Sequence, residues 1–379
     1  MEPLNHFLRS LLFYCICTLS LRADVVPFFD PTTKHKSSTY NLNIQEFIAN
    51  EPISLTEFFG DWEHSYHPKD GKNIALQMLR VDVGGEFLED YYLGYFYQYD
   101  VFIKTNKDFS DFYHTIKNKK EFYHDRNYRL DLTLEGIQES GLILSKRFSL
   151  YHDSVHRLLV GAGVDVRFGH EMQDGFIQGS ASSPSQKRYV AQGSSRYHYT
   201  QNYLYDLDVG QASGFGYGGA VALDYYNRAL SFGAKVVVND IFARMYWRDL
   251  PFSKVDIQTK NKDIDADGYT TYHPSISGLE KREDFTQKIS PRVKVVLEKE
   301  LYPYVKVFVG LERVYGENFP YVRFSEQLDD NQEVLLGYEN RFHTFGVDYR
   351  YESFMIGVSA DAFSHFSALG LRASFQHQF

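Results

Sequence analysis

The sequence of 379 residues is poor in three residue types, with Trp 2, Met 5 and Pro 11. It contains no run of about 20 apolar residues, which argues against a bundle of transmembrane helices. A mean hydropathy of -0.39 supports that exclusion. The net charge of -9 carries no basic signature, and we therefore expect no nucleic acid partner.

Cysteine is also scarce, and both cysteines, Cys15 and Cys17, lie in the first 23 residues. Residues 1–23 combine Arg9 with an apolar stretch that is too short to span a bilayer as a helix, which indicates a secretory signal peptide. A buried N-terminal helix is the alternative. If cleavage follows Ala23, the mature chain has no cysteine, and neither a disulfide nor a thiolate metal site can form.

Aromatic residues are abundant instead, with Tyr 30 and Phe 31, and they follow a period of two. The last segment, 367–379, places Leu369, Leu371, Ala373, Phe375 and Phe379 on one face of a strand. The same alternation recurs through most of 73–379. One face of these strands is apolar, and the other carries charges and glycine.

A soluble β-sandwich or lipocalin-like barrel is the alternative, but a dry core rejects so many charges. Apolar rows of about 9 to 11 residues match a tilted membrane strand. Strands that span a bilayer must close into a barrel, because every backbone polar group must be paired. The charged face then lines the lumen: Arg129, Asp131, Glu135, Asp165, Arg167, Asp224, Lys235, Arg292, Lys294, Glu298, Lys306, Glu312, Asp348, Arg350, Asp361 and Arg372.

The terminal strand, which ends in Phe379, resembles the C-terminal signature of Gram-negative outer-membrane β-barrels. This resemblance covers 367–379 closely and 73–379 only in pattern, and it names a class rather than a family. It implies localisation in the bacterial outer membrane and contact with outer-membrane lipid. It also implies that the barrel-assembly machinery reads Leu371, Phe375 and Phe379 as an assembly signal.

The fold class predicted is all-β: a transmembrane antiparallel β-barrel of about 14 strands, within a range of 12 to 16, with long extracellular loops and short periplasmic turns. Thirteen strands are expected from the alternation, at 73–84, 87–103, 127–137, 139–150, 155–168, 200–209, 215–226, 229–248, 288–298, 302–313, 341–350, 353–362 and 367–379. A further strand at 53–62 makes the number even.

This layout predicts periplasmic turns at 85–86, 138, 227–228, 299–301 and 351–352, and long extracellular loops at 104–126, 249–287 and 314–340. Segment 169–199 falls on the periplasmic side and is either an inward loop or a hidden hairpin that raises the count to 16 strands. The expected domains are a signal peptide (1–23), a periplasmic N-terminal segment or plug (24–52) and the barrel (53–379). A 14-stranded barrel with an N-terminal plug is similar in layout to the outer-membrane fatty-acid transporters.

Two groups of residues suggest chemistry. Asp263, Asp265 and Asp267 precede Gly268 as in the first half of a calcium loop, but Pro274 replaces the final Glu, so a solvated acidic loop is favoured over divalent cation binding. His152 with Asp153 and Ser154, and Ser364 with His365, place hydrolase residue types together in expected tight turns, where such residues are common for local reasons.

The preferred function is an outer-membrane channel or transporter for passive passage of a small solute or amphiphile, without a cofactor and without catalysis. A non-transporting surface barrel with partner-binding loops is the first alternative, and an outer-membrane hydrolase is the second. The substrate and the oligomeric state stay open.

Overall fold

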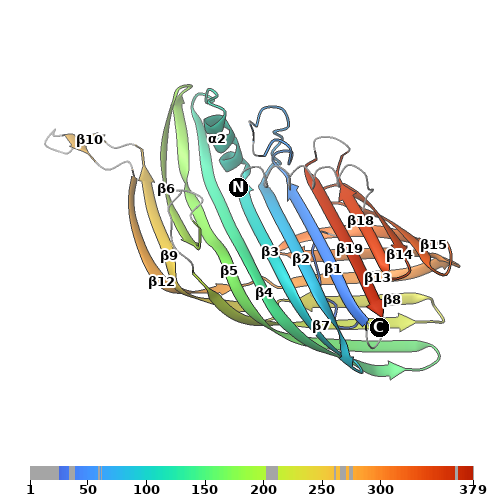
Figure 1. Cartoon of the computed structure of the whole chain (residues 1–379). Helices are drawn as coiled ribbons and strands as arrows, with labels where there is room; N and C mark the ends of the chain where they lie inside the picture. The colour runs from blue at the N-terminus through green and yellow to red at the C-terminus, as the bar shows by residue number, and fades with distance from the viewer. Residues whose placement is uncertain are drawn as a thin grey trace, which may run out of the picture.

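The chain forms a closed antiparallel barrel. The computed structural model describes residues 25–33, 39–58, 60, 62–201, 212–259, 262–264, 270–272, 276–362 and 366–378. Within these residues a single sheet of 17 strands closes on itself, because β1 (Thr39–Asn50) pairs with both β2 (Lys72–Leu88) and β19 (Ala368–Gln378) (Figure 1). The predicted all-β antiparallel barrel is confirmed.

Fourteen of the described strands pair consecutively into a ring. Between β2 and β19, the ring comprises β3 (Tyr91–Asn106), β4 (Arg126–His152), β5 (His156–Ser185), β7 (Gly214–Asn227), β8 (Phe232–Asn239), β13 (Arg292–Tyr302), β14 (Val305–Val314), β15 (Glu317–Gln327), β16 (Gln332–Glu339), β17 (Thr344–Tyr351) and β18 (Phe354–Ala360). The expected number of about 14 describes this ring but not the whole sheet.

Three further strands extend the ring on one side, where β5 is longest. They are β6 (Arg188–Tyr199), β9 (Arg244–Gln258) and β12 (Ile276–Lys288), and they pair in the order β5–β6–β9–β12. The short hairpin β10 (Lys262–Ile264) and β11 (Thr270–Tyr272) forms a separate sheet. Figure 1 shows this extension rising beside β4 and β5.

The period of two sorts the side chains into an outer and an inner face. One row of cross-strand partners joins Val83, Tyr95, Leu142, Val166 and Tyr217, and each of these side chains is exposed. The row three positions along the strands, Arg80, Gln98 and Glu139, is buried and lies on the other face because the offset is odd. Because cross-strand partners point to the same side of a sheet, the apolar row marks the outside of the barrel and the polar row its lumen.

The two ends of the barrel differ. At one end, here called the turn end, the strands are joined by short connections at 89–90, 153–155, 228–231, 303–304, 328–331 and 352–353. The strand ends at the opposite, loop end flank the connections 51–71, 107–125, 259–275, 340–343 and 361–367 and the tight turns 186–187 and 315–316. The ends of β1 and β19 that lie next to the chain termini are both at the turn end.

Several predicted boundaries are wrong. The first strand is β1, not 53–62, so the sheet begins at Thr39 and not at residue 53, and 24–52 is not a single segment outside the sheet. No turn interrupts β4 at residue 138, because β4 is one strand from Arg126 to His152, with a register shift against β5 between Gln138 and Glu139. The expected loop 314–340 contains β15 and β16, whose rows include Pro320 and several glutamates and are less regular than those of other strands.

Segment 169–199 is the hidden hairpin rather than an inward loop, since the second half of β5 pairs with β6. Its two halves extend the sheet toward the loop end, so they add no strand to the ring. The expected loop 249–287 is likewise mostly strand, through β9 and β12. Most of the expected strand 200–209 lies outside the described residues.

The helix α2 (Lys107–Lys117) follows β3 at the loop end. Asn106 caps it, because its side chain accepts a hydrogen bond from the Phe109 N–H. Phe112 of the helix packs with Tyr128 and Leu130 of β4, which belong to the outer face. The helix therefore lies outside the barrel wall. No helix in the described ranges has both the length and the apolar character needed to cross a membrane.

Candidate functional site

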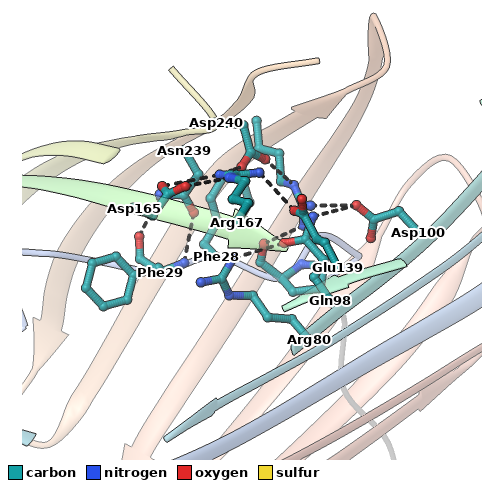
Figure 2. A network of polar contacts seen from close by, with 12 residues as sticks. Phe28, Phe29, Arg80, Gln98, Asp100, Glu139, Asp165, Arg167, Asn239 and Asp240 are labelled. Atoms are coloured by element: carbon teal, nitrogen blue, oxygen red, sulfur yellow. Dashed lines mark hydrogen bonds and ion pairs between the residues drawn. The ribbon is translucent and has the colours of Figure 1, made fainter. Parts of the chain in front are cut away.

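The lumen is crossed by a network of buried polar and charged side chains, shown in Figure 2. This group, called the lumen network below, consists of Arg80, Asp82, Gln98, Asp100, Glu139, Asp165, Arg167, Asp240 and Arg292. They come from β2, β3, β4, β5 and β13 and from the connection between β8 and β9. The network thus ties together walls that are distant in the sequence.

Two guanidinium groups form its centre. Arg167 contacts Asp165 at 2.5 Å, Asp240 at 2.6 Å and Glu139 at 2.9 Å. Arg292 contacts Asp100 at 2.5 Å and also reaches Asp240 at 2.8 Å. Asp240 is therefore shared between the two guanidinium groups, and the planar fork of Arg is suited to such multiple contacts.

A third guanidinium group completes the network. Arg80 donates to both carboxylate oxygens of Asp82, at 2.9 and 3.0 Å, and to Gln98 at 2.9 Å. Gln98 then donates to Asp100 at 2.9 Å, which connects this group to Arg292. Separating any one of these side chains from its partners would leave a buried charge uncompensated, which is energetically costly. We therefore expect the network to be rigid.

The backbone at two positions makes room for these side chains. A Cβ atom on Gly218 would lie 2.7 Å from the Arg167 guanidinium, so only glycine fits beside it on β7. Asp240 has a positive φ of 61° at the break between β8 and β9, which turns its carboxylate into the network. Asp can adopt this left-handed conformation at moderate cost.

The N-terminal segment, residues 25–33, lies within the lumen and contacts opposite walls: Gln45 of β1 accepts a hydrogen bond from the Phe28 N–H at 3.3 Å, and the other contacts come from β8, β13 and β14. The backbone N–H groups of Val25 and Val26 donate to the Glu312 carboxylate at 3.1 and 3.0 Å. Asn239 accepts from the Phe29 N–H and donates to the Phe29 carbonyl, both at 2.8 Å. Arg292 donates to the Pro27 carbonyl at 3.3 Å, which connects the segment to the lumen network.

The segment separates two parts of the lumen. Val25 and Val26 pack into a buried apolar cluster toward the loop end that includes Phe47, Met78 and Phe319. On the turn side lies a cavity of about 350 Å³, lined by Phe28, Phe29 and Met355 together with Lys294 and Arg372, among others. A polar vestibule of about 720 Å³ adjoins it, and Arg350 and Gln376 line both spaces.

The charged residues that the sequence predicts for the lumen do face it, with one exception. All of them except Asp361 lie at inward-facing places of their strands by register. Asp165, Arg167, Arg292, Glu312 and Asp348 are buried, whereas Arg129 is mostly exposed at the loop end. Asp361 lies after β18 and accepts backbone hydrogen bonds from Ser367 and Ala368.

The expectation missed residues that complete the network. Asp100 and Gln98 show the same alternation on β3 as the chosen residues, so the signal that identifies them was present. Arg80 and Asp82 sit two residues apart on β2, again on the polar face. Asp240 lies in a break between strands and has no periodic signal.

The other predicted sites lie elsewhere. Leu371 and Phe375 are on the outer face of β19, and Phe379 is outside the described residues. Asp263 lies in β10, whereas Asp265 and Asp267 are outside the described residues, as is His365. The described part of the chain has no group of His, Cys, Asp and Glu that could hold a metal ion.

Asp153 organises a turn rather than a catalytic group. Its carboxylate accepts from the N–H groups of His156 at 2.5 Å and Val155 at 2.8 Å, and from the Tyr151 hydroxyl at 2.8 Å. These hydrogen bonds, the His156 N–H first, lower the pKa of Asp153 to about 2. His152 contacts Arg228 at 2.8 Å and not Asp153 or Ser154, so the hydrolase hypothesis gains no support here.

Neither a protein-family model nor a curated protein matches this sequence. Among solved structures, a mutant of the monoaromatic hydrocarbon channel TodX is similar at 12% identity and a TM-score of 0.46, with 90% of each chain covered. The toluene transporter TbuX of Ralstonia pickettii matches at 10% identity and a TM-score of 0.43, with 91% of this chain and 90% of that one covered.

The outer-membrane protease OmpT of Escherichia coli matches at 11% identity and a TM-score of 0.25, with 92% of this chain and 99% of that one covered. These likenesses are too distant to assign a function. The class follows from the barrel itself, which is closed, apolar outside and charged inside. The architecture is that of an outer-membrane β-barrel, as the terminal strand predicts.

Proposed function

We propose that this protein is a gated outer-membrane channel for a small solute or amphiphile, closed by its own N-terminal segment. The observation that carries the proposal is the seat of residues 25–33 in the lumen. The segment forms no strand pair with the wall and is held by side chains such as Glu312 and Asn239. Contacts of this kind can be released without breaking the barrel.

The cavity beside the segment supports passage of a molecule with both apolar and polar parts. Phe28, Phe29 and Met355 offer apolar surface, and Lys294 and Arg372 offer cationic groups. The adjoining vestibule leads toward the turn end, where its lining is polar. In the orientation usual for this class, short turns face the periplasm, so the open half of the lumen faces inward.

A closed, non-transporting barrel is the second candidate. The lumen network favours it, because Asp100, Glu139 and Asp240 are all at most 2% exposed and fixed by guanidinium groups. The segment and the network form one barrier through Arg292. A channel therefore requires that the segment and the lumen network both move aside, whereas a surface barrel requires no opening.

Deletion of residues 25–33 distinguishes the two candidates. We expect the purified, refolded deletion variant to show higher conductance in planar bilayers and faster solute entry into liposomes than the full chain. Circular dichroism and heat-dependent gel mobility report whether its barrel has folded. A folded deletion variant with no conductance and no solute entry would favour the closed barrel.

A single substitution provides the same test with the chain intact. In Gly161→Ala, the new Cβ atom would lie 2.5 Å from the Pro31 backbone, so the segment must shift. Gly163→Ala is the matched control, because its Cβ atom would meet Ser145 at 3.0 Å and not the segment. We expect increased conductance from Gly161→Ala only.

A further inference from the structure

One of the apolar cross-strand rows on the outer face ends in cationic side chains. The row that includes Val83, Tyr95, Leu142 and Val166 continues through Tyr217 to Arg244 of β9 and Lys288 of β12. These are successive cross-strand partners, so Arg244 and Lys288 point to the same side as the apolar residues. Arg248 follows on the same face of β9 and is also exposed.

Two like charges are direct partners in this row. Arg244 faces Lys288 across the β9–β12 pair, and such an arrangement destabilises a sheet unless an anion lies between the charges. Within the described part of the chain, Arg244, Arg248 and Lys288 form neither an ion pair nor a side-chain hydrogen bond. Other exposed cations nearby, such as Arg282 with Asp249, do have acidic partners.

Aromatic rings border these charges on the side of the apolar rows. Tyr217 and Tyr246 are 44% and 41% exposed, and their hydroxyl groups lie 3.3 Å apart. Phe215, the cross-strand partner of Tyr246, contacts Phe168 at a ring distance of 5.9 Å. Phe242, at the break before β9, is 83% exposed. Exposed rings beside cations are typical of the level where acyl chains meet headgroups.

We propose that this cationic patch, defined by Arg244, Arg248 and Lys288, binds the phosphate of a membrane lipid whose acyl chains lie along Phe215, Phe168 and Val166. Guanidinium groups bind phosphate with paired hydrogen bonds, and a phosphate between Arg244 and Lys288 removes their repulsion. Continuity with the apolar row argues for a lipid rather than a soluble anion. The inference rests on the barrel spanning a membrane, not on transport.

Binding is tested with the purified full chain in detergent, by native mass spectrometry and by thermal unfolding. The probes are lipid A, which carries two phosphates, the same lipid after dephosphorylation, phosphatidylcholine and inorganic phosphate. We expect lipid A to bind and to raise the Tm, and the other three to do so weakly. In Arg244→Gln/Lys288→Gln, the affinity for lipid A should fall roughly tenfold or more, because both charged donors to the phosphate are lost.

The matched control is Lys187→Gln/Arg188→Gln, which removes two exposed cations at the loop end of the sheet and should leave lipid A binding unchanged. Without lipid, the Arg244→Gln/Lys288→Gln variant should be at least as stable as the wild type, because like charges no longer face each other. Equal binding of dephosphorylated lipid, equal stabilisation by inorganic phosphate, or unchanged affinity in this variant would each overturn the proposal.

Discussion

Arg167→Met removes the centre of the lumen network with little change in side-chain length. Arg167 is 2% exposed, and its guanidinium is the common partner of Glu139, Asp165 and Asp240. Breaking a buried ion pair by removing one partner costs about 3–5 kcal/mol. Since three carboxylates lose a partner here, we expect a loss near the upper end of that range.

Denaturant unfolding of the refolded barrel in detergent measures this loss. The denaturant midpoint of Arg167→Met should lie markedly below that of the wild type. The midpoint of Arg167→Lys should lie between these two values, because a single ammonium cannot contact three carboxylates as a planar guanidinium does. A second substitution, Glu139→Gln, should restore part of the stability of Arg167→Met by removing one unpaired charge.

Arg350→Met is the matched control. Arg350 also faces the lumen, but its side chain is 49% exposed and it pairs with Glu333 at 2.7 Å. An exposed pair contributes about 0–1 kcal/mol, so this change should move the midpoint little. If Arg167→Met and Arg350→Met were equally stable, the reasoning that the network forms a rigid, desolvated barrier would be refuted.

Two further predictions concern the connections. Asp153→Ala should be less stable than the wild type at neutral pH; because folding lowers the Asp153 pKa from 3.8 to about 2, this difference should shrink as the pH falls through that interval, which unfolding at several pH values checks. Asn106→Ala should destabilise α2 by about 1 kcal/mol through loss of its cap, seen as faster amide exchange confined to the helix, and exchange spread over β3 and β4 would contradict this.

Alternation predicted the barrel well where one face meets lipid and the other meets charge. From Leu158 to Phe168 in β5 and from Leu369 to Phe375 in β19 the apolar positions are uninterrupted, so strand and orientation follow from the residues there. The second half of β5 lacks such a row, and the sequence does not predict it as part of the same strand. Alternation is weak in β15, where Pro320 and glutamates interrupt it, and in β1, where NLNIQEF is largely polar, so the sequence predicts neither strand. It predicts a turn at residue 138 because Gly136, Gln138 and Ser140 interrupt the apolar row of β4.

The candidate site also has a part that the sequence predicts and a part that it does not. Register places the predicted charges, such as Asp165 and Glu312, on the inner face, and the period of two is enough to expect this. Which charges meet is a property of the closed ring, since Arg167 comes from β5, Asp240 from the connection between β8 and β9, and Arg292 from β13. No local sequence pattern reports the distances between these side chains.

The sequence by itself determined the class of fold, because lipid on one side and water on the other impose a period of two on every spanning strand. Only the tertiary structure decided which groups cross the lumen. Residues 25–33 lie across it, and Arg292 of β13 meets Asp100 of β3 on the far side of the ring. Such contacts arise from the curvature and register of the whole sheet, which no single strand encodes.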